Sequence, residues 1–478
     1  METGAVKEVL NFINNEKLSN CLVGQNLFAS TKDSASESVK AANFFPSHDV
    51  VSEKRRIAVI GLGYVGLPLA VEFGKLQPII GFDIQESRIK ELNNYFDRTK
   101  ELNETELRSA QIKYTSDPSE LRTANFIIVA VPTPIDIYKK PDLSPIISAS
   151  EIIGKNLTKG AIIVFESTVY PGVTENICGP IIEKQSGLKR SVDFKLGYSP
   201  ERTNPGDKNH TISSVVKIVS GEDQEALNTI SETYLTICKG GIYKTKDIKT
   251  AEAAKVIENV QRDLNIAIVN ELTLIFHKLG IKPKEVFKAA GTKWNFHHYE
   301  PGLVGGHCIG VDPFYLTYLA ESIGYIPQVI LAGRRVNDYM PIYAAELTVK
   351  GLIEAGKPVL NSKVLILGLT FKENVCDTRN SKVKDIIKTL KEYGVCVYAH
   401  DPMLSIDEVK EFNAIDVQSL DSANNFDAVA LCVPHEPFKQ LTIERISGFM
   451  SGKPVIVDIK GMLNGAEIDN SRFIYKYF

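Results

Sequence analysis

The stretch Ile57-Ala58-Val59-Ile60-Gly61-Leu62-Gly63-Tyr64-Val65-Gly66 decides the fold of the first half of this chain. A short apolar run leads into a G-x-G-x-x-G turn, placed after a predicted strand and before a predicted helix. The first two glycines permit a tight turn and the close approach of a pyrophosphate, and the third lets the helix pack on the strand. The stretch therefore predicts a dinucleotide-binding unit of the Rossmann type.

The residues that follow repeat the same alternation of strand and helix. Apolar β-type runs occur at Ile79–Phe82, Phe126–Val131 and Ala161–Phe165, with helical segments between them, and Lys195–Tyr198 and Val215–Val219 extend the series. Continuous apolar strands separated by helices are typical of a buried parallel sheet with helices on both faces. We therefore expect a doubly wound α/β domain.

A long helix and a second α/β pattern complete the predicted architecture. Ile248 to Leu279 contains neither Pro nor Gly and is long enough to connect two domains. A new series of apolar strands then begins at Lys363-Val364-Leu365-Ile366-Leu367-Gly368-Leu369 and continues at Cys396–Ala399, Ala428–Val433 and Val455–Ile459. The predicted fold class is α/β, with two Rossmann-like doubly wound domains joined by a long central helix.

The expected domain boundaries follow from these patterns. Residues 1–53 include the polar, serine-rich segment Ser30–Ser38 and form an N-terminal extension that we expect to be disordered or loosely attached. The first Rossmann domain is expected at 54–247, a central helical domain at 248–350 and the second Rossmann-like domain at 351–478.

Bulk properties exclude several classes of protein. The chain has 478 residues, enough for two or three domains, and its net charge of -3 favours neither nucleic acid nor an anionic membrane as partner. No apolar run approaches the roughly 20 residues of a membrane span. Met1-Glu2-Thr3-Gly4 does not begin a signal peptide, and the seven scattered cysteines have no zinc-ligand spacing. We expect a cytoplasmic protein with reduced thiols and no metal site.

Asp83 indicates which dinucleotide is bound. It ends the second apolar strand, where a carboxylate can accept both ribose hydroxyls and repel a 2′-phosphate, so NAD is favoured over NADP. Arg88 either lies over the adenine or is a surface arginine. Pro132, Thr133 and Thr168 follow two further strands, at the edge where such sheets bind ligands. They either face the cofactor or are ordinary strand-end residues.

Cys308 gives the clearest indication of the chemistry. It lies in the glycine-rich stretch Pro301-Gly302-Leu303-Val304-Gly305-Gly306-His307-Cys308-Ile309-Gly310-Val311-Asp312-Pro313. A hydride-accepting cofactor alone takes an alcohol to an aldehyde, whereas a thiolate can trap the aldehyde for a second hydride loss. The pairing predicts oxidation of an alcohol to an acid. His307 could favour the thiolate, and a buried structural thiol is the alternative.

Other polar residues are candidates for the same site. Lys255 and Asn259, four residues apart on the long helix, share a face that either stabilises an oxyanion or is simply solvated. Glu201, on a loop after a strand, either activates water or pairs with Arg202 at the surface. Asp312 is either catalytic or the N-cap of a helix that begins near Pro313.

From Arg56 to the C-terminus, the sequence resembles the UDP-glucose/GDP-mannose dehydrogenases. Ala290-Gly291-Thr292-Lys293-Trp294-Asn295-Phe296, followed by Pro301–Pro313, is similar to the UDP-N-acetylhexosamine 6-dehydrogenases of bacterial and archaeal polysaccharide synthesis. The resemblance implies an N-terminal NAD domain, a central dimerisation region and a C-terminal UDP-sugar domain. A homodimer that takes NAD and a UDP-sugar is therefore expected.

The resemblance also implies a role for each matching residue. Cys308 is expected to be the nucleophile, with Lys255 and Asn259 as oxyanion contacts, Glu201 and Asp312 as acid/base groups, and Thr168 beside the nicotinamide. The expected cofactor contacts are Gly61, Gly63, Tyr64, Val65, Gly66, Asp83, Arg88, Pro132, Thr133, Thr168 and Arg379. The expected substrate contacts are Glu201, Arg202, Lys255, Asn259, Lys293, Tyr299, Gly302, Gly305, Phe371, Lys372 and Lys460.

Two departures from the resemblance bear on these expectations. UDP-glucose members carry an arginine upstream of the cysteine that reaches the substrate across the dimer. Here Lys293 is the nearest candidate, at a different spacing. The N-terminal extension has no counterpart in the family.

The expected reaction is the NAD-dependent four-electron oxidation of C6 of UDP-GalNAc or UDP-GlcNAc to the uronate, through a Cys308 thiohemiacetal and thioester. UDP-glucose and UDP-ManNAc are alternative substrates. A two-electron β-hydroxyacid dehydrogenase would need neither Cys308 nor a second Rossmann-like domain. An inactive sugar-nucleotide binding protein is the alternative of another class.

Overall fold

The computed structural model describes residues 55–203, 210–463 and 471–478, so the predicted N-terminal extension lies outside the described residues. The first domain is built on a sheet of eight described strands in the order β3-β2-β1-β4-β5-β6-β7-β8, parallel except where β6 meets β7. The strands are β1 Ile57–Ile60, β2 Ile79–Phe82, β3 Ile112–Thr115, β4 Phe126–Val129, β5 Ala161–Phe165, β6 Phe194–Tyr198, β7 Lys217–Gly221 and β8 Ile242–Lys244.

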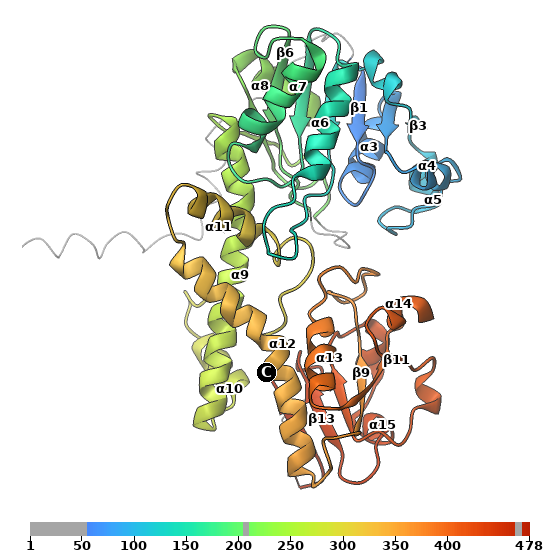
Figure 1. The fold of residues 1–478 in the computed structure, drawn as a ribbon, viewed down its shortest axis with the longest axis vertical. Coiled ribbons are helices and arrows are strands. Elements are labelled where there is room, and N and C mark those ends of the chain that lie inside the picture. The colour runs from blue at the N-terminus through green and yellow to red at the C-terminus, as the bar shows by residue number, and fades with distance from the viewer. Residues whose placement is uncertain (1–54, 204–209, 464–470) are drawn as a thin grey trace, which may run out of the picture. The chain divides into compact units, whose positions relative to one another are not determined.

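Helices cover both faces of this first sheet (Figure 1). Ile57 and Val59 of β1 pack into the core beneath α3 and α8, whereas Ala58 and Ile60 point into the core beneath α6 and α7. This alternation of side chains across a strand explains why β1 is buried over its whole length. The helices are α3 Gly66–Gly74, α4 Glu86–Asn93, α5 Glu104–Arg108, α6 Ser144–Asn156, α7 Gly179–Ser186 and α8 Gln224–Leu235.

The second sheet has six described strands, all parallel, in the order β11-β10-β9-β12-β13-β14. Its strands are β9 Lys363–Leu367, β10 Cys396–His400, β11 Ile415–Asp416, β12 Ala428–Leu431, β13 Val455–Asp458 and β14 Ile474–Tyr477. Its helices are α13 Val383–Glu392, α14 Ile406–Lys410 and α15 Ile443–Ser447. The strand order reverses between β9 and β12, as it does between β1 and β4 in the first sheet, and ligands of doubly wound folds bind at such switch points.

Long helices connect the two sheets. The helix α9 spans Ile248–Leu279, the predicted range. Asp247 caps its start by accepting a hydrogen bond from the Thr250 amide, and Gly280, with φ +69°, ends it. Figure 1 shows α12 (Gln328–Glu354) running beside α9. The remaining helices here are α10 Pro283–Ala290 and α11 Asp312–Ser322. The predicted fold class is confirmed.

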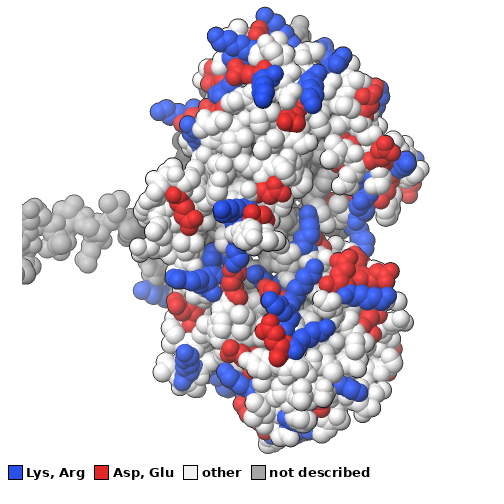
Figure 2. Space-filling model, in the orientation of Figure 1, with Lys and Arg blue, Asp and Glu red and all other residues white. Residues whose placement is uncertain are grey.

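The surface has mixed charge. Figure 2 shows acidic and basic side chains interspersed on the face viewed, without a broad field of one sign. Within the described residues, every helix is too short or too polar to span a bilayer.

Candidate active site

The glycine turn after β1 forms a cradle that fits a dinucleotide. Gly61 has φ +88°, and a Cβ there would lie 2.7 Å from the Ala130 carbonyl oxygen; a Cβ on Gly66 would lie 1.8 Å from the Gly61 oxygen. Neither position therefore tolerates a side chain. Gly63 faces open space, where a pyrophosphate could approach the backbone. Asp83 at the end of β2 accepts a 2.9 Å hydrogen bond from the Leu62 amide, which fixes the carboxylate beside this cradle.

Arg88 supports the glycine turn from inside the domain. Its side chain is buried, its Nε donates to the Leu62 carbonyl at 2.9 Å, and its Nη2 pairs with Asp97 at 2.7 Å. It is therefore not the surface arginine that the sequence left open. Its contact with adenine stays a prediction.

The strand ends beside the cradle carry the two predicted threonines. Thr133 follows β4, and the hydroxyl of Tyr315 on α11 donates to the carbonyl oxygen of the next residue, Pro134, at 3.1 Å. The segment that leads to Thr168 stays beside β4, because the amides of Glu166 and Ser167 both bond to the Val129 carbonyl. Both threonines, and Pro132 with them, thus lie at the carboxyl edge of the first sheet.

Four of the predicted catalytic residues meet where α9 faces the cysteine loop. Lys255 and Asn259 are buried on α9, and Asn259 Nδ2 donates to Asp312 Oδ2 at 2.6 Å. The Asp312 amide donates to the Cys308 carbonyl at 2.8 Å, which places cysteine and carboxylate one turn apart. The N-cap alternative for Asp312 is wrong, because α11 begins at Asp312 itself and its carboxylate is bonded to Asn259.

Burial and the neighbouring charges set the ionisation of this cluster. Desolvation and the nearby Asp312 carboxyl raise the pKa of Cys308 to about 11, opposed by Lys255 and Arg379. Burial raises the pKa of Asp312 to about 6, and the Lys255 ammonium opposes this rise. Lys255 therefore favours the anionic form of both groups.

Glu201 reaches the same cluster from the loop after β6. Its carboxylate is buried and accepts backbone hydrogen bonds from Arg202, at 2.7 Å, and from Thr203. Burial alone would raise the pKa of Glu201. The Lys217 charge and the hydrogen bonds from Thr203 outweigh burial and lower this pKa below its ordinary value, and Lys255 adds a smaller effect in the same direction. The guanidinium of Arg202 pairs with Glu258 at 2.7 Å, so the predicted alternative of a surface pair with Glu201 is wrong.

His307 joins the cysteine loop to the two Rossmann-like domains. Its ring lies 5.8 Å from that of Tyr64 in the glycine turn and 5.7 Å from that of Phe371. Arg379 pairs with Asp377 at 2.6 Å and lies 4.8 Å above the Tyr64 ring. Burial and the Arg379 charge lower the pKa of His307 to about 4. A neutral imidazole gives Cys308 no positive charge, so the hypothesis that His307 favours the thiolate fails.

A cavity of about 280 Å³ opens between the cysteine loop and the second sheet. Four predicted substrate residues line it, namely Gly305, Phe371, Lys372 and Lys460. A Cβ on Gly302 would lie 2.6 Å from Lys460 Nζ, and one on Gly305 would lie 2.6 Å from the Asn380 carbonyl oxygen, so both glycines permit close packing. Lys293 is exposed and Tyr299 is half-buried, and neither lines this cavity.

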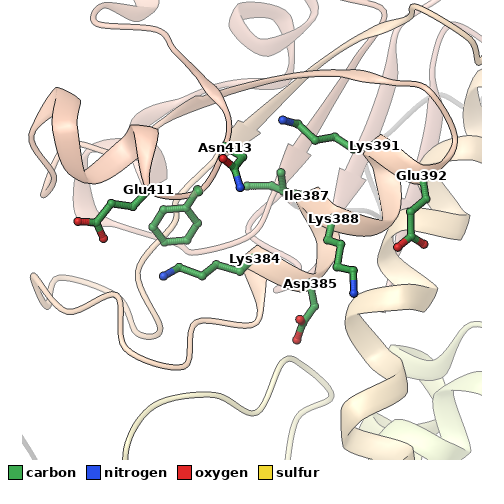
Figure 3. A pocket seen from close by; sticks show the side chains of 9 residues that line it. Lys384, Asp385, Ile387, Lys388, Lys391, Glu392, Glu411 and Asn413 are labelled. Atoms are coloured by element: carbon green, nitrogen blue, oxygen red, sulfur yellow. The ribbon is translucent and has the colours of Figure 1, made fainter. Parts of the chain in front are cut away.

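A second cavity, of about 540 Å³, lies in the second Rossmann-like domain between α13 and the end of α14 (Figure 3). Charged side chains dominate its lining, which consists of Lys384, Asp385, Ile387, Lys388, Lys391, Glu392, Glu411, Phe412 and Asn413. No residue predicted for cofactor or substrate belongs to it.

The structure adds residues to the site that the sequence analysis did not single out. Asn270 of α9 clamps the cysteine loop: its Oδ1 accepts from the Gly302 amide at 2.8 Å and its Nδ2 donates to the Gly302 carbonyl at 3.0 Å. Lys217 and Glu166 form a buried pair at 2.6 Å behind Glu201. A lysine within the apolar run Val215–Val219 was the one signal in the sequence, because a buried lysine needs a partner.

Comparison with protein-family models matches nearly the whole described chain. Residues 55–238 match the NAD binding domain of the UDP-glucose/GDP-mannose dehydrogenase family, residues 249–339 match its central domain, and residues 365–465 match its UDP binding domain.

The chain belongs to the UDP-glucose/GDP-mannose dehydrogenase family.

Individual relatives agree with this membership. The chain is 51% identical to Protein CapL of Staphylococcus aureus over 422 residues, 88% of this chain and 99% of that protein. It is also 51% identical to UDP-N-acetyl-D-glucosamine 6-dehydrogenase of Salmonella typhi over 87% of this chain and 98% of that one. The structure of a UDP-D-ManNAc dehydrogenase from Pyrococcus horikoshii superposes with a TM-score of 0.80 at 30% identity, over 88% of this chain and 98% of the other. This dehydrogenase is thus an NAD-dependent oxidoreductase of nucleotide sugars.

Proposed function

We propose that this dehydrogenase oxidises the C6 hydroxymethyl of a UDP-N-acetylhexosamine, UDP-GlcNAc or UDP-GalNAc, to the carboxylate, for the synthesis of surface polysaccharide. The observation that carries the proposal is the convergence of Cys308, Lys255, Asn259 and Asp312 beside a dinucleotide cradle. Relatives at 51% and 49% identity carry the name of a UDP-N-acetyl-D-glucosamine 6-dehydrogenase, which favours an acetamido sugar.

In the first oxidation, Asp312 is the proton acceptor. Its carboxyl has a pKa of about 6, so it is mainly ionised at neutral pH and can take the C6 hydroxyl proton, directly or through water beside Thr168. NAD, when bound, would supply the hydride acceptor, with one NAD consumed in each of the two oxidations. Lys255 and Asn259, both buried on α9, would stabilise the oxygen on which negative charge develops.

Cys308 then carries the substrate through the second oxidation. Its sulfur adds to the aldehyde carbon and its proton passes to the oxygen, which gives a thiohemiacetal. Loss of a second hydride from this carbon and of the hydroxyl proton leaves a thioester. Glu201 deprotonates a water that attacks the thioester carbonyl, and the carbon–sulfur bond breaks to release the acid and the Cys308 thiol. Two hydrides and one water account for the conversion.

The three expected domains divide these tasks. Residues 54–247 hold NAD with the glycine turn and Asp83, and residues 248–350 carry Lys255 and Cys308. Residues 351–478 hold the UDP moiety, for which the cavity near Phe371, Lys372 and Lys460 offers an aromatic ring and ammonium groups.

We also propose a homodimer that forms through α9. Ile257, Ile268, Ile275 and Leu279 are exposed and share one face of α9, and Val329 and Ile342 are exposed on α12. Such a stripe of apolar side chains is typical of a helix that packs against a partner. The six described cysteines are free, which favours a reducing, cytoplasmic setting.

Steady-state NAD reduction with a panel of UDP-sugars tests the proposal. We expect kcat/KM for UDP-GlcNAc or UDP-GalNAc to exceed that for UDP-glucose by at least about tenfold, because a site that pairs the acetamido group leaves polar groups unsatisfied when glucose binds. Equal or better use of UDP-glucose would overturn the assignment to acetamido sugars. If none of the UDP-sugars in the panel leads to formation of NADH, the proposed function as a whole is overturned.

A further inference from the structure

Lys217 is a fully buried cation directly behind Glu201. It is the first residue of β7 and is 1% exposed. Its Nζ lies 2.6 Å from Glu166 Oε2, 3.0 Å from the Pro200 carbonyl oxygen, which accepts a hydrogen bond from it, and 4.0 Å from Glu201 Oε2. Burying an ammonium group this deeply is unfavourable unless the group is paired, so the retention of Lys217 calls for a reason.

We propose that Lys217 is a positioning residue for Glu201: it keeps the Glu201 side chain ionised and oriented for the water that attacks the thioester, while Glu166 and Tyr234 hold Lys217 in place. This inference rests on the proposed role of Glu201 in the hydrolytic step.

The two oxygens of Glu201 are in different surroundings, and this difference supports the proposal. Oε1 accepts the backbone amides of Arg202 and Thr203, which fixes the carboxylate plane. Oε2 is buried without a hydrogen-bond partner among the described residues. At 4.0 Å, Lys217 attracts this oxygen without donating a hydrogen bond to it. Oε2 thus stays available to accept a proton from water.

Two hydrogen bonds hold the Lys217 ammonium group away from Glu201. Its Nζ donates to Glu166 Oε2 at 2.6 Å and to the Pro200 carbonyl oxygen at 3.0 Å. The second oxygen of Glu166 accepts the Tyr234 hydroxyl at 2.5 Å. The Ser199 hydroxyl ties the loop to β7 by donating to the Ile218 carbonyl at 2.8 Å. The cation is therefore fixed beneath the loop that carries Glu201.

Other charged or titratable groups also face Glu201. Lys255 approaches it from α9 and favours its ionised form, whereas Glu166 and Glu201 repel each other. Two thiols, Cys308 in the cysteine loop and Cys238 after α8, lie close enough to feel its charge. Lys217 has the largest electrostatic effect on Glu201 of these charged groups. Removal of Lys217 should therefore change the pKa of Glu201 although the other groups remain.

The test is the pH dependence of acid release in variants of the full-length enzyme. Lys217→Met removes the charge at nearly constant volume, so the Glu201 pKa should rise and the acidic limb of the hydrolysis rate should move to higher pH. We expect at least a fivefold loss at pH 6.5 that recovers at pH 8.5. Glu166→Gln removes the repelling charge and should move the same limb to lower pH. Lys217→Arg should keep the limb of the wild type.

Two further variants exclude a merely structural effect. In a Glu201→Gln background, where acid release should already be slow at every pH, Lys217→Met should cause no further loss. The double variant Lys217→Met/Glu166→Gln removes both members of the buried ion pair, so it tests the proposal even if Lys217→Met fails to fold. Its limb should still lie at higher pH than that of the wild type, because attraction by Lys217 outweighs repulsion by Glu166.

The rapid first formation of NADH, measured separately, should keep its pH dependence in these variants. An unchanged acidic limb in both Lys217→Met and Lys217→Met/Glu166→Gln, with an active wild type, would overturn the inference and leave the proposed function standing. If the wild type reduces no NAD with any UDP-sugar, the proposed function itself fails. Full acid release by Glu201→Gln would show that Glu201 has no role in hydrolysis, and this inference would then fail as well.

Discussion

At the scale of single residues, the raised pKa of Cys308 keeps its thiol protonated at neutral pH. Burial and Asp312 raise its pKa to about 11. Because the thiolate is the reactive form, alkylation of Cys308 in the free enzyme should be slow at pH 7.5 and should rise about tenfold for each pH unit up to pH 10. A half-buried, protonated thiol also escapes unwanted oxidation better than a free thiolate would.

Iodoacetamide labelling followed by peptide mass spectrometry measures this rise, with the exposed Cys396 as internal control. Lys255→Met should slow the labelling of Cys308 further, because Lys255 lowers its pKa. A labelling rate for Cys308 that levels off below pH 8 would contradict a raised pKa.

Site residues could be predicted where they lie in or beside a recognisable sequence motif. Cys308, Asp312, Lys255 and Asn259 could be predicted because a glycine-rich stretch and helical spacing surround them. The pair of Lys217 with Glu166 could not, because 51 residues separate its members and only the folded sheet brings them together. Burial showed that Arg88 is not a surface arginine and that His307 is neutral.

At the scale of elements, α9 positions the cysteine loop through one side chain. Asn270 binds both backbone groups of Gly302 and also donates to Asn337 Oδ1 at 2.8 Å. Asn270→Ala would leave these buried groups without partners, each at a cost of about 1–3 kcal/mol. We expect the free energy of unfolding to fall by at least about 2 kcal/mol, and KM for the UDP-sugar to rise severalfold because Gly302 abuts Lys460.

Urea unfolding and steady-state kinetics measure both effects. Asn265→Ala, a half-buried change on the same helix, is the matched control and should stay within about 0.5 kcal/mol of the wild type. Equal stability of the two variants would show that the hydrogen bonds of Asn270 to Gly302 do not contribute to the free energy of unfolding.

The long helix and the apolar inner strands of both sheets were predictable, and the strands at the sheet edges were not. The range of α9 was correct, since thirty-two residues without Pro or Gly give an unambiguous signal. The strands β3, β8, β11 and β14 were missed. β3, for example, reads Ile112-Lys113-Tyr114-Thr115 and lies at the sheet edge, where no continuous apolar run is required.

At the scale of the whole molecule, Asp338 of α12 joins three parts of the chain. Its carboxylate binds Lys139 from the loop after β4 at 2.6 Å, Arg334 at 2.6 Å, and Lys382 just before α13 at 2.9 Å. Burial alone would raise the pKa of Asp338, but the charges of Arg334 and Lys382 lower this pKa to about 2. The carboxylate of Asp338 therefore links the loop after β4, the helix α12 and the residue before α13.

A group whose folded pKa is depressed stabilises the protein above its unfolded pKa and loses this effect as the pH falls toward the folded value. Asp338→Asn should therefore lower the free energy of unfolding by about 2 kcal/mol at pH 7. The difference from the wild type should persist to about pH 5 and shrink below pH 4. Urea unfolding across this range measures it, and a difference that grows on acidification would contradict the assignment.

The two-step oxidation through Cys308 is tested most directly by the stoichiometry of one reaction. A limiting amount of UDP-GlcNAc or UDP-GalNAc, whichever is used better, is consumed with excess NAD, and both NADH and the uronate are quantified. The account predicts two NADH for each uronate with the wild-type enzyme, and no uronate with Cys308→Ala. One NADH for each sugar with an aldehyde as product, or full acid formation by Cys308→Ala, would contradict it.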